Sequence, residues 1–95
     1  MPRRTQGLPE HFRQHEETVA KAIGDRIRQR RTQLQLTQED LLARVELNEV
    51  HISHTQFSRI ENGHLLANAA EIIALAEALS VTCSWLLLGQ EQAST

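Results

Sequence analysis

Apolar residues recur at helical spacing along most of this chain, and polar residues interrupt them at regular points. Val19, Ile23, Ile27 and Leu34 lie on one stripe, at spacings of four, four and seven residues. Such a stripe is typical of an amphipathic helix that buries one face. It predicts a first helix over residues 16–33.

Four more helices are predicted further along, each opened by a residue whose side chain can cap the first turn. A Ser, Thr or Asn side chain accepts a hydrogen bond from a first-turn N–H, and a suitable residue three positions on can return one. The helices and their caps are 37–46 (Thr37, then Asp40), 53–61 (Ser53, then Gln56), 68–79 (Asn68, then Glu71) and 83–88 (Thr82). Glycines follow the third and the fifth of the five helices, where the chain must turn through positive φ.

Each of these four helices has an apolar side that can enter a common core. The predicted core residues are, in the order of the four helices, Leu41, Leu42 and Val45; Ile52, Phe57 and Ile60; Ile72, Leu75, Ala76 and Leu79, with Ile73 beside them; and Trp85 and Leu86. Leu87 or Leu88 is left over and needs a cover.

The composition favours a single all-α domain. Aromatic residues make up only 3% of the 95 residues, which argues against a sheet, and Leu, Ala, Gln, Glu and Arg dominate. The only prolines, Pro2 and Pro9, precede the predicted helices. We therefore divide the chain into a flexible N-terminal tail at 1–15, a helical domain at 16–89 and a C-terminal tail at 90–95.

Little in the sequence points to catalysis or to a bound cofactor. The lone Cys83 cannot form an internal disulfide, which fits a reducing compartment. His51 and His54 have a spacing found in some metal sites, but no further ligand set completes a tetrahedron. We find no nucleophile–base pair, glycine-rich phosphate loop, signal peptide or membrane-length apolar run. We expect a cytoplasmic protein that is not an enzyme and needs no cofactor or metal.

Charge is distributed unevenly along the chain. Residues 1–44 hold nine Lys or Arg and six Asp or Glu, whereas residues 45–95 hold one and six. This asymmetry indicates a basic face built from the first half, suited to a polyanionic partner.

The predicted helix 53–61 carries a polar face opposite its apolar anchor. Side chains 54, 55, 58 and 59 point away from Phe57 and Ile60 on a helical wheel. His54 and Thr55 can donate or accept hydrogen bonds, and Arg59 can contact guanine through two parallel bonds. A helix with such a face is suited to a DNA groove.

Several segments together resemble the phage repressor/Cro type of helix-turn-helix domain, also called the xenobiotic-response-element family. They are Leu36–Ala43 (LTQEDLLA), Ile52–Ser53, Ser58–Gly63 (SRIENG), Ala74–Val81 (ALAEALSV) and Trp85–Leu87 (WLL). The resemblance covers about residues 18–89. It implies a five-helix, repressor-like fold and sequence-specific binding of double-stranded DNA, as in a small prokaryotic or phage transcriptional regulator, most often a repressor. Helix 53–61 would read the major groove.

The resemblance also implies a role for individual residues. The base readers would be His54, Thr55 and Arg59. The residues near the phosphates would be Ser53, Gln56, Ser58 and Asn62, together with Gln38, which would also brace the recognition helix. Arg31 and Glu61 would form a partly buried ion pair between the first and third helices, and we expect its role to be structural.

The link between the second and third helices departs from the family pattern. The family has a short turn opened by Gly, whereas this chain has His51 at that place and about five extra residues at 46–50. Either the second helix runs on by one turn or the link is a wider loop. We expect Glu46 and Glu49 to point away from DNA, since they would repel phosphate.

Two questions about partners stay open at this stage. An alternative function is that of an antitoxin or protein-interaction module, which caps a partner such as a toxin or another regulator and binds DNA secondarily. The leftover Leu87 or Leu88 favours a homodimer, which would place two helices on DNA half-sites about 34 Å apart; the other possibility is a monomer whose C-terminal tail covers that surface.

Overall fold

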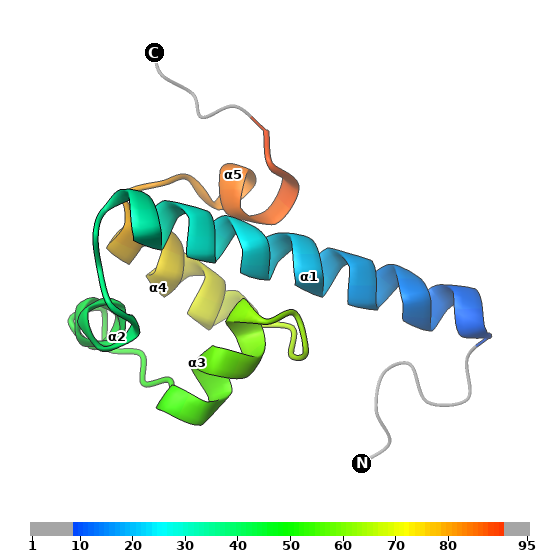
Figure 1. Ribbon diagram of the computed structural model, residues 1–95, viewed down its shortest axis with the longest axis horizontal. Coiled ribbons are helices and arrows are strands. Elements are labelled where there is room, and N and C mark those ends of the chain that lie inside the picture. The colour runs from blue at the N-terminus through cyan, green and yellow to red at the C-terminus, as the bar shows by residue number, and fades with distance from the viewer. Residues whose placement is uncertain (1–8, 91–95) are drawn as a thin grey trace.

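The computed structural model describes residues 9–90, and these residues form five α-helices (Figure 1). The helices are α1 (Glu10–Gln33), α2 (Gln38–Glu46), α3 (His54–Glu61), α4 (Ala69–Leu79) and α5 (Cys83–Leu88). Within the described residues the predicted all-α, five-helix class is confirmed. Residues 1–8 and 91–95, which hold most of the two predicted tails, lie outside the described part.

The first helix begins six residues earlier than the hydrophobic pattern predicted. It starts at Glu10 instead of residue 16, after Pro9, whose carbonyl accepts a hydrogen bond from the Phe12 N–H at 3.1 Å. The N-terminal half of α1 projects beyond the other helices (Figure 1). A projecting segment faces no core and therefore carries no apolar stripe, which is why the pattern missed it.

The core lies between α1 and the four shorter helices. α1 packs on α3, α4 and α5, and α2 packs on α4 and α3. The predicted stripes supply most of the buried side chains, which include Ile23, Ile27, Leu41, Val45, Phe57, Ile60, Leu75, Leu79 and Leu86. Ile73, predicted beside the α4 stripe, is 60% exposed, and Leu87 and Leu88 are also exposed.

Side-chain caps fix the starts of the shorter helices. Thr37 with Asp40, and Asn68 with Glu71, each form a complete capping box at α2 and α4. Thr82 accepts from the Trp85 N–H at the start of α5, at 3.0 Å. Each such cap contributes about 0.5–2 kcal/mol to helix stability. The cap positions read from the sequence are therefore correct.

Arginines from the first half of the chain close the C-terminal ends of the later helices. Arg26 donates to the carbonyls of Leu86 and Leu87, both at 3.1 Å. Arg30 and Arg44 donate to carbonyls at the end of α4, at 2.9 and 3.3 Å. A cation is favourable at a helix C-terminus. The charge asymmetry of the sequence thus reflects helix capping in part.

Of the two predicted forms of the link between α2 and α3, a longer second helix or a wider loop, the structure has the wider loop. α2 ends at Glu46, and residues 47–53 lead to the start of α3. Glu49 adopts a left-handed conformation with φ of 61°, which turns the chain. His51 is exposed, and its Nδ1 lies 2.9 Å from Glu46 Oε2.

Candidate nucleic-acid interface

The helix α3 is anchored by one apolar face. Phe57 and Ile60 are fully buried, with exposures of 0% and 1%. His54, Thr55 and Arg59 are exposed. The structure therefore leaves the three predicted base readers accessible on α3.

The residues predicted to lie near phosphates are more dispersed. Ser53 and Asn62 are exposed at the two ends of α3, and Ser58 is half-buried. Ser53 caps the helix, because its Oγ accepts from the Gln56 N–H at 3.1 Å. The Gln56 side chain turns toward α4 instead, where its Nε2 donates to Glu71 Oε2 at 2.9 Å. One of its two amide hydrogens is thus used inside the protein.

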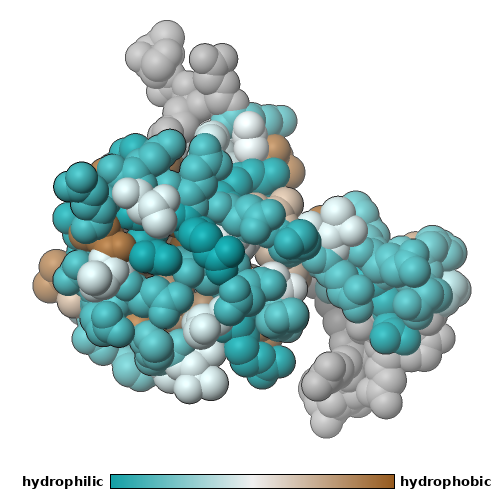
Figure 2. All heavy atoms as spheres, viewed as in Figure 1, coloured by the Kyte–Doolittle hydropathy of each residue, from teal (hydrophilic) through white to brown (hydrophobic). Residues whose placement is uncertain are grey.

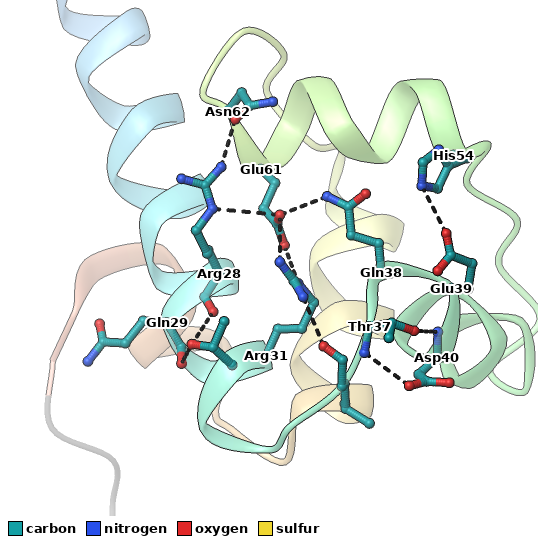
Figure 3. Close-up of polar contacts among 12 residues, drawn as sticks. Arg28, Gln29, Arg31, Thr37, Gln38, Glu39, Asp40, His54, Glu61 and Asn62 are labelled. Atoms are coloured by element: carbon teal, nitrogen blue, oxygen red, sulfur yellow. Dashed lines mark hydrogen bonds and ion pairs between the residues drawn. The ribbon is translucent and has the colours of Figure 1, made fainter.

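A buried carboxyl group at the end of α3 joins three helices. Glu61 is 1% exposed, and Arg31 of α1 donates to both of its oxygens, at 2.7 and 3.1 Å. Gln38 of α2 donates to Glu61 Oε1 at 2.9 Å (Figure 3). Arg31 also donates to the Leu36 carbonyl at 2.8 Å. The ion pair implied by the resemblance is present, and it fixes α3 against both α1 and α2.

Gln38 lies at the first position of α2, where it can both brace α3 and face outward. Its bond to Glu61 uses one amide hydrogen and supplies the bracing contact. The side chain is half-buried, and the second amide hydrogen can still donate. Its contact with a phosphate stays a prediction.

Arg28 is a neighbour of this network that sequence reasoning did not single out. Its Nη2 donates to Asn62 Oδ1 at 2.6 Å, and its Nε lies 3.7 Å from Glu61 Oε1. Because the Asn62 oxygen accepts this bond, the amide NH₂ of Asn62 keeps both hydrogens for other partners. Arg28 itself is about half exposed, so the pair adds positive charge beside the end of α3.

Gly24 is a second residue that sequence reasoning missed. A Cβ atom at this position would lie 2.5 Å from the carbonyl oxygen of Ile60 and 2.6 Å from that of Glu61. α1 can therefore approach the end of α3 only because residue 24 has no side chain. A glycine inside an otherwise helical pattern was the available signal.

Two histidine–carboxylate pairs flank the loop between α2 and α3. His54 Nε2 lies 3.4 Å from Glu39 Oε1, and His51 pairs with Glu46. The four residues line a shallow hollow of about 340 Å³. Among residues 9–90, no group of three or more His, Cys, Asp or Glu side chains could hold a metal ion.

The start of α2 carries a carboxyl group with a perturbed pKa. The hydrogen bond from the Thr37 backbone N–H, at 3.0 Å, holds the pKa of Asp40 below its ordinary value of 3.8. The Thr37 side chain and, to a lesser extent, the charge of Arg44 act in the same direction. The ionised form of Asp40 therefore stabilises the cap.

The face of the molecule seen in Figure 2 is mostly hydrophilic. No helix in the described part of the chain combines the length and the apolar character needed to cross a membrane.

Comparison with known proteins supplies the family. A family model described as a helix-turn-helix domain matches residues 22–83, which is more than half of the chain. Neither the curated proteins nor the solved structures contain a significant match. The matched range includes α2, α3 and α4 entirely, together with Arg31, Gln38 and Glu61 of the buried network, and the match supports DNA binding. The chain therefore belongs to the helix-turn-helix domain family, consistent with the repressor/Cro type that its sequence resembles.

Proposed function

We propose that this protein is a sequence-specific regulator of transcription that acts as a repressor and reads the DNA major groove with α3. The observation that carries the proposal is the division of α3 into two faces. Its apolar face and Glu61 are fixed in the core, whereas His54, Thr55 and Arg59 are exposed together. A rigid helix with reaching polar side chains is what reading of base edges requires.

The three exposed residues would each take a distinct share of base reading. Arg59 would donate two parallel bonds to O6 and N7 of a guanine, which discriminates by about 1–3 kcal/mol. Thr55 can contact a base through its hydroxyl or its methyl group. His54 can donate or accept.

Contacts with phosphates would position α3 on the duplex. The N–H groups at the starts of α2 and α3, next to Thr37 and Ser53, are suited to phosphate oxygens. Gln38, Ser58 and Asn62 would add side-chain donors, and Gln56 would contribute its remaining amide hydrogen. Such contacts fix the register but carry no sequence information.

Binding to DNA that flanks the gene tests this proposal. We expect a specific complex in gel shifts that weakens steeply as salt rises, because phosphate contacts release counterions. Gln38→Ala should weaken binding to all sequences by a similar factor, since its predicted contact is with the backbone. The absence of any salt-sensitive, specific complex below the concentration at which the protein aggregates would refute the proposal.

We further propose that the protein binds DNA as a homodimer. Leu66, Ile73 and Leu87 are exposed around an apolar hollow of about 560 Å³ between α1, α4 and α5. Exposed apolar surface of this kind is typical of an interface. A dimer would also double the number of base pairs that are read, by placing two copies of α3 on adjacent half-sites.

The same hollow favours a second candidate function, which is binding to a different protein. An antitoxin-like or regulatory partner with an apolar segment could occupy the surface around Ile73 instead of a second copy. This function predicts a monomer that forms a stable complex only with that partner. It is compatible with DNA binding through α3, because the hollow is lined by other helices.

A further inference from the structure

His54 and Glu39 face each other across the starts of α3 and α2 (Figure 3). The His54 Nε2 atom lies 3.4 Å from Glu39 Oε1. Both side chains extend from first turns that are fixed by side-chain caps, at Ser53 for His54 and at Thr37 for Glu39. The buried network around Glu61 joins the start of α2 to the other end of α3, through the bond from Gln38.

This contact bears on which ring nitrogen of His54 carries the hydrogen. A neutral imidazole has one N–H donor and one acceptor nitrogen, and a neighbouring partner sets their arrangement. The Glu39 carboxylate can only accept, so it favours the hydrogen on Nε2. The Nδ1 atom is then left as an acceptor.

We propose that Glu39 is a positioning residue for base reading. It holds His54 with Nδ1 as the acceptor, and His54 thereby selects a base with an amino group in the major groove. Adenine N6 and cytosine N4 are the amino donors there, whereas guanine and thymine offer acceptors. His54 therefore favours adenine or cytosine at the position that it contacts. This inference rests on the proposed function and specifies the base class that one residue of α3 selects.

Protonation would reverse the chemistry of this contact. A charged imidazole donates from both nitrogens, so His54 would then favour an acceptor such as guanine N7. The ionisable groups around His54 are Glu39 and Glu46 from α2 and His51 from the loop, all lining the same hollow. The neutral imidazole is the form that offers Nδ1 to the base as an acceptor.

The tautomer of His54 can be measured without DNA. Ring-nitrogen NMR shifts at pH 8 should show the hydrogen mainly on Nε2 in the parent protein. Glu39→Ala should move the ratio toward the Nδ1–H form. Glu46→Ala removes the same charge from the same helix, next to His51 instead, and should leave the His54 ratio unchanged. A ratio that is the same in the parent and in Glu39→Ala would overturn the proposal.

Base preference is the second readout, measured at pH 8 on DNA sequences selected by the parent protein. His54→Ala identifies the position that His54 reads. At that position the parent should prefer adenine or cytosine over guanine by about fivefold or more. Fivefold corresponds to the lower end of the discrimination that a good base contact provides, about 1 kcal/mol. Glu39→Ala should reduce this preference at least twofold, while Glu46→Ala retains it.

A double variant separates a positioning role from direct reading by Glu39. In the His54→Ala background, Glu39→Ala should change no base preference, because Glu39 acts through the histidine. A preference that Glu39→Ala still alters in that background would overturn the proposal, as would a parent preference for guanine or thymine at pH 8. If the parent selects no sequence at all, the proposed function fails and this inference fails with it. If it selects a sequence and only the Glu39 effects are missing, this inference fails alone.

Discussion

At the scale of single residues, the buried carboxyl group of Glu61 shows how the fold and the candidate site depend on each other. Arg31 and Gln38 donate three hydrogen bonds to its two oxygens. A buried charged group is tolerated only when it is paired and hydrogen-bonded. Because Glu61 ends α3, the same bonds that satisfy it also set the orientation of the exposed residues at the other end of the helix.

Loss of Arg31 should therefore destabilise the protein strongly. Arg31→Ala removes the cation that donates to both oxygens of the buried Glu61 carboxyl group and leaves only the half-exposed Arg28 at 3.7 Å. We expect the free energy of unfolding to fall by about 3–5 kcal/mol. Urea denaturation, followed by circular dichroism, measures this change. Arg13→Ala is the matched control, since its pair with Glu10 is exposed and worth about 0–1 kcal/mol. Equal effects of the two substitutions would contradict the account.

Some site residues could be assigned from the sequence and others could not. The exposure of His54, Thr55 and Arg59 follows from helical geometry, because Phe57 and Ile60 define the buried face of α3. Their role as base readers is implied by the family resemblance and stays a prediction. The Gln56–Glu71 and His54–Glu39 contacts join different helices. Their geometry depends on how the helices pack, which no local pattern specifies.

At the scale of helices, local rules predicted the starts well and failed where a helix leaves the core. The caps at Thr37, Ser53, Asn68 and Thr82 are all present, because a cap needs only its own first turn. The start of α1 was missed because hydrophobic spacing reports burial, and residues 10–15 are exposed. The form of the α2–α3 link could not be predicted from the sequence. Its turn depends on Glu49 with a positive φ, a conformation that is uncommon for a glutamate.

The approach of α1 to α3 gives a second prediction. Alanine is a better helix former than glycine by about 1 kcal/mol, so an isolated helix would gain from Gly24→Ala. In the folded protein the new Cβ would meet two backbone carbonyl oxygens within 2.6 Å, and we expect a net loss of about 1–3 kcal/mol from overpacking. Thermal and urea denaturation measure it. Increased stability in Gly24→Ala would show that α1 and α3 are further apart than described.

The cap of α2 gives a prediction for pH dependence. The folded-state pKa of Asp40 is lowered, so its stabilising contribution is fully present above the ordinary value and is lost as pH falls through the folded value. The parent should be more stable than Asp40→Asn at neutral pH, and the difference should shrink as pH falls below about 4. Carboxyl NMR titration of Asp40 should give a pKa below 3.8. A midpoint at or above that value would contradict the capping account.

At the scale of the whole molecule, the proposed DNA-reading face and the apolar hollow lie on different elements. The proposed base readers belong to α3, whereas the hollow is formed by α1, α4 and α5 with the segment before α4. One surface can therefore contact DNA while the other contacts a second copy. This separation is what a dimeric reader of two half-sites needs.

The proposed dimer can be tested by substitution in the hollow. Ile73→Glu places a charge on the proposed interface, and sedimentation should then show a monomer at concentrations where the parent is a dimer. Leu47→Glu is the control, because Leu47 is 84% exposed in the α2–α3 loop, outside the hollow. A parent protein that stays monomeric at high concentration, with and without DNA, would refute the dimer and favour a different protein partner.

Selection of bound sequences from a random pool of double-stranded DNA tests the central claim most directly. The parent protein should enrich one motif that contains a guanine read by Arg59, in two half-sites about one helical turn apart. Arg59→Ala should bind more weakly and enrich the same motif without a preference at that guanine. Failure of the parent to enrich any motif, or an unchanged motif with Arg59→Ala, would contradict the assignment of α3 as the reading helix.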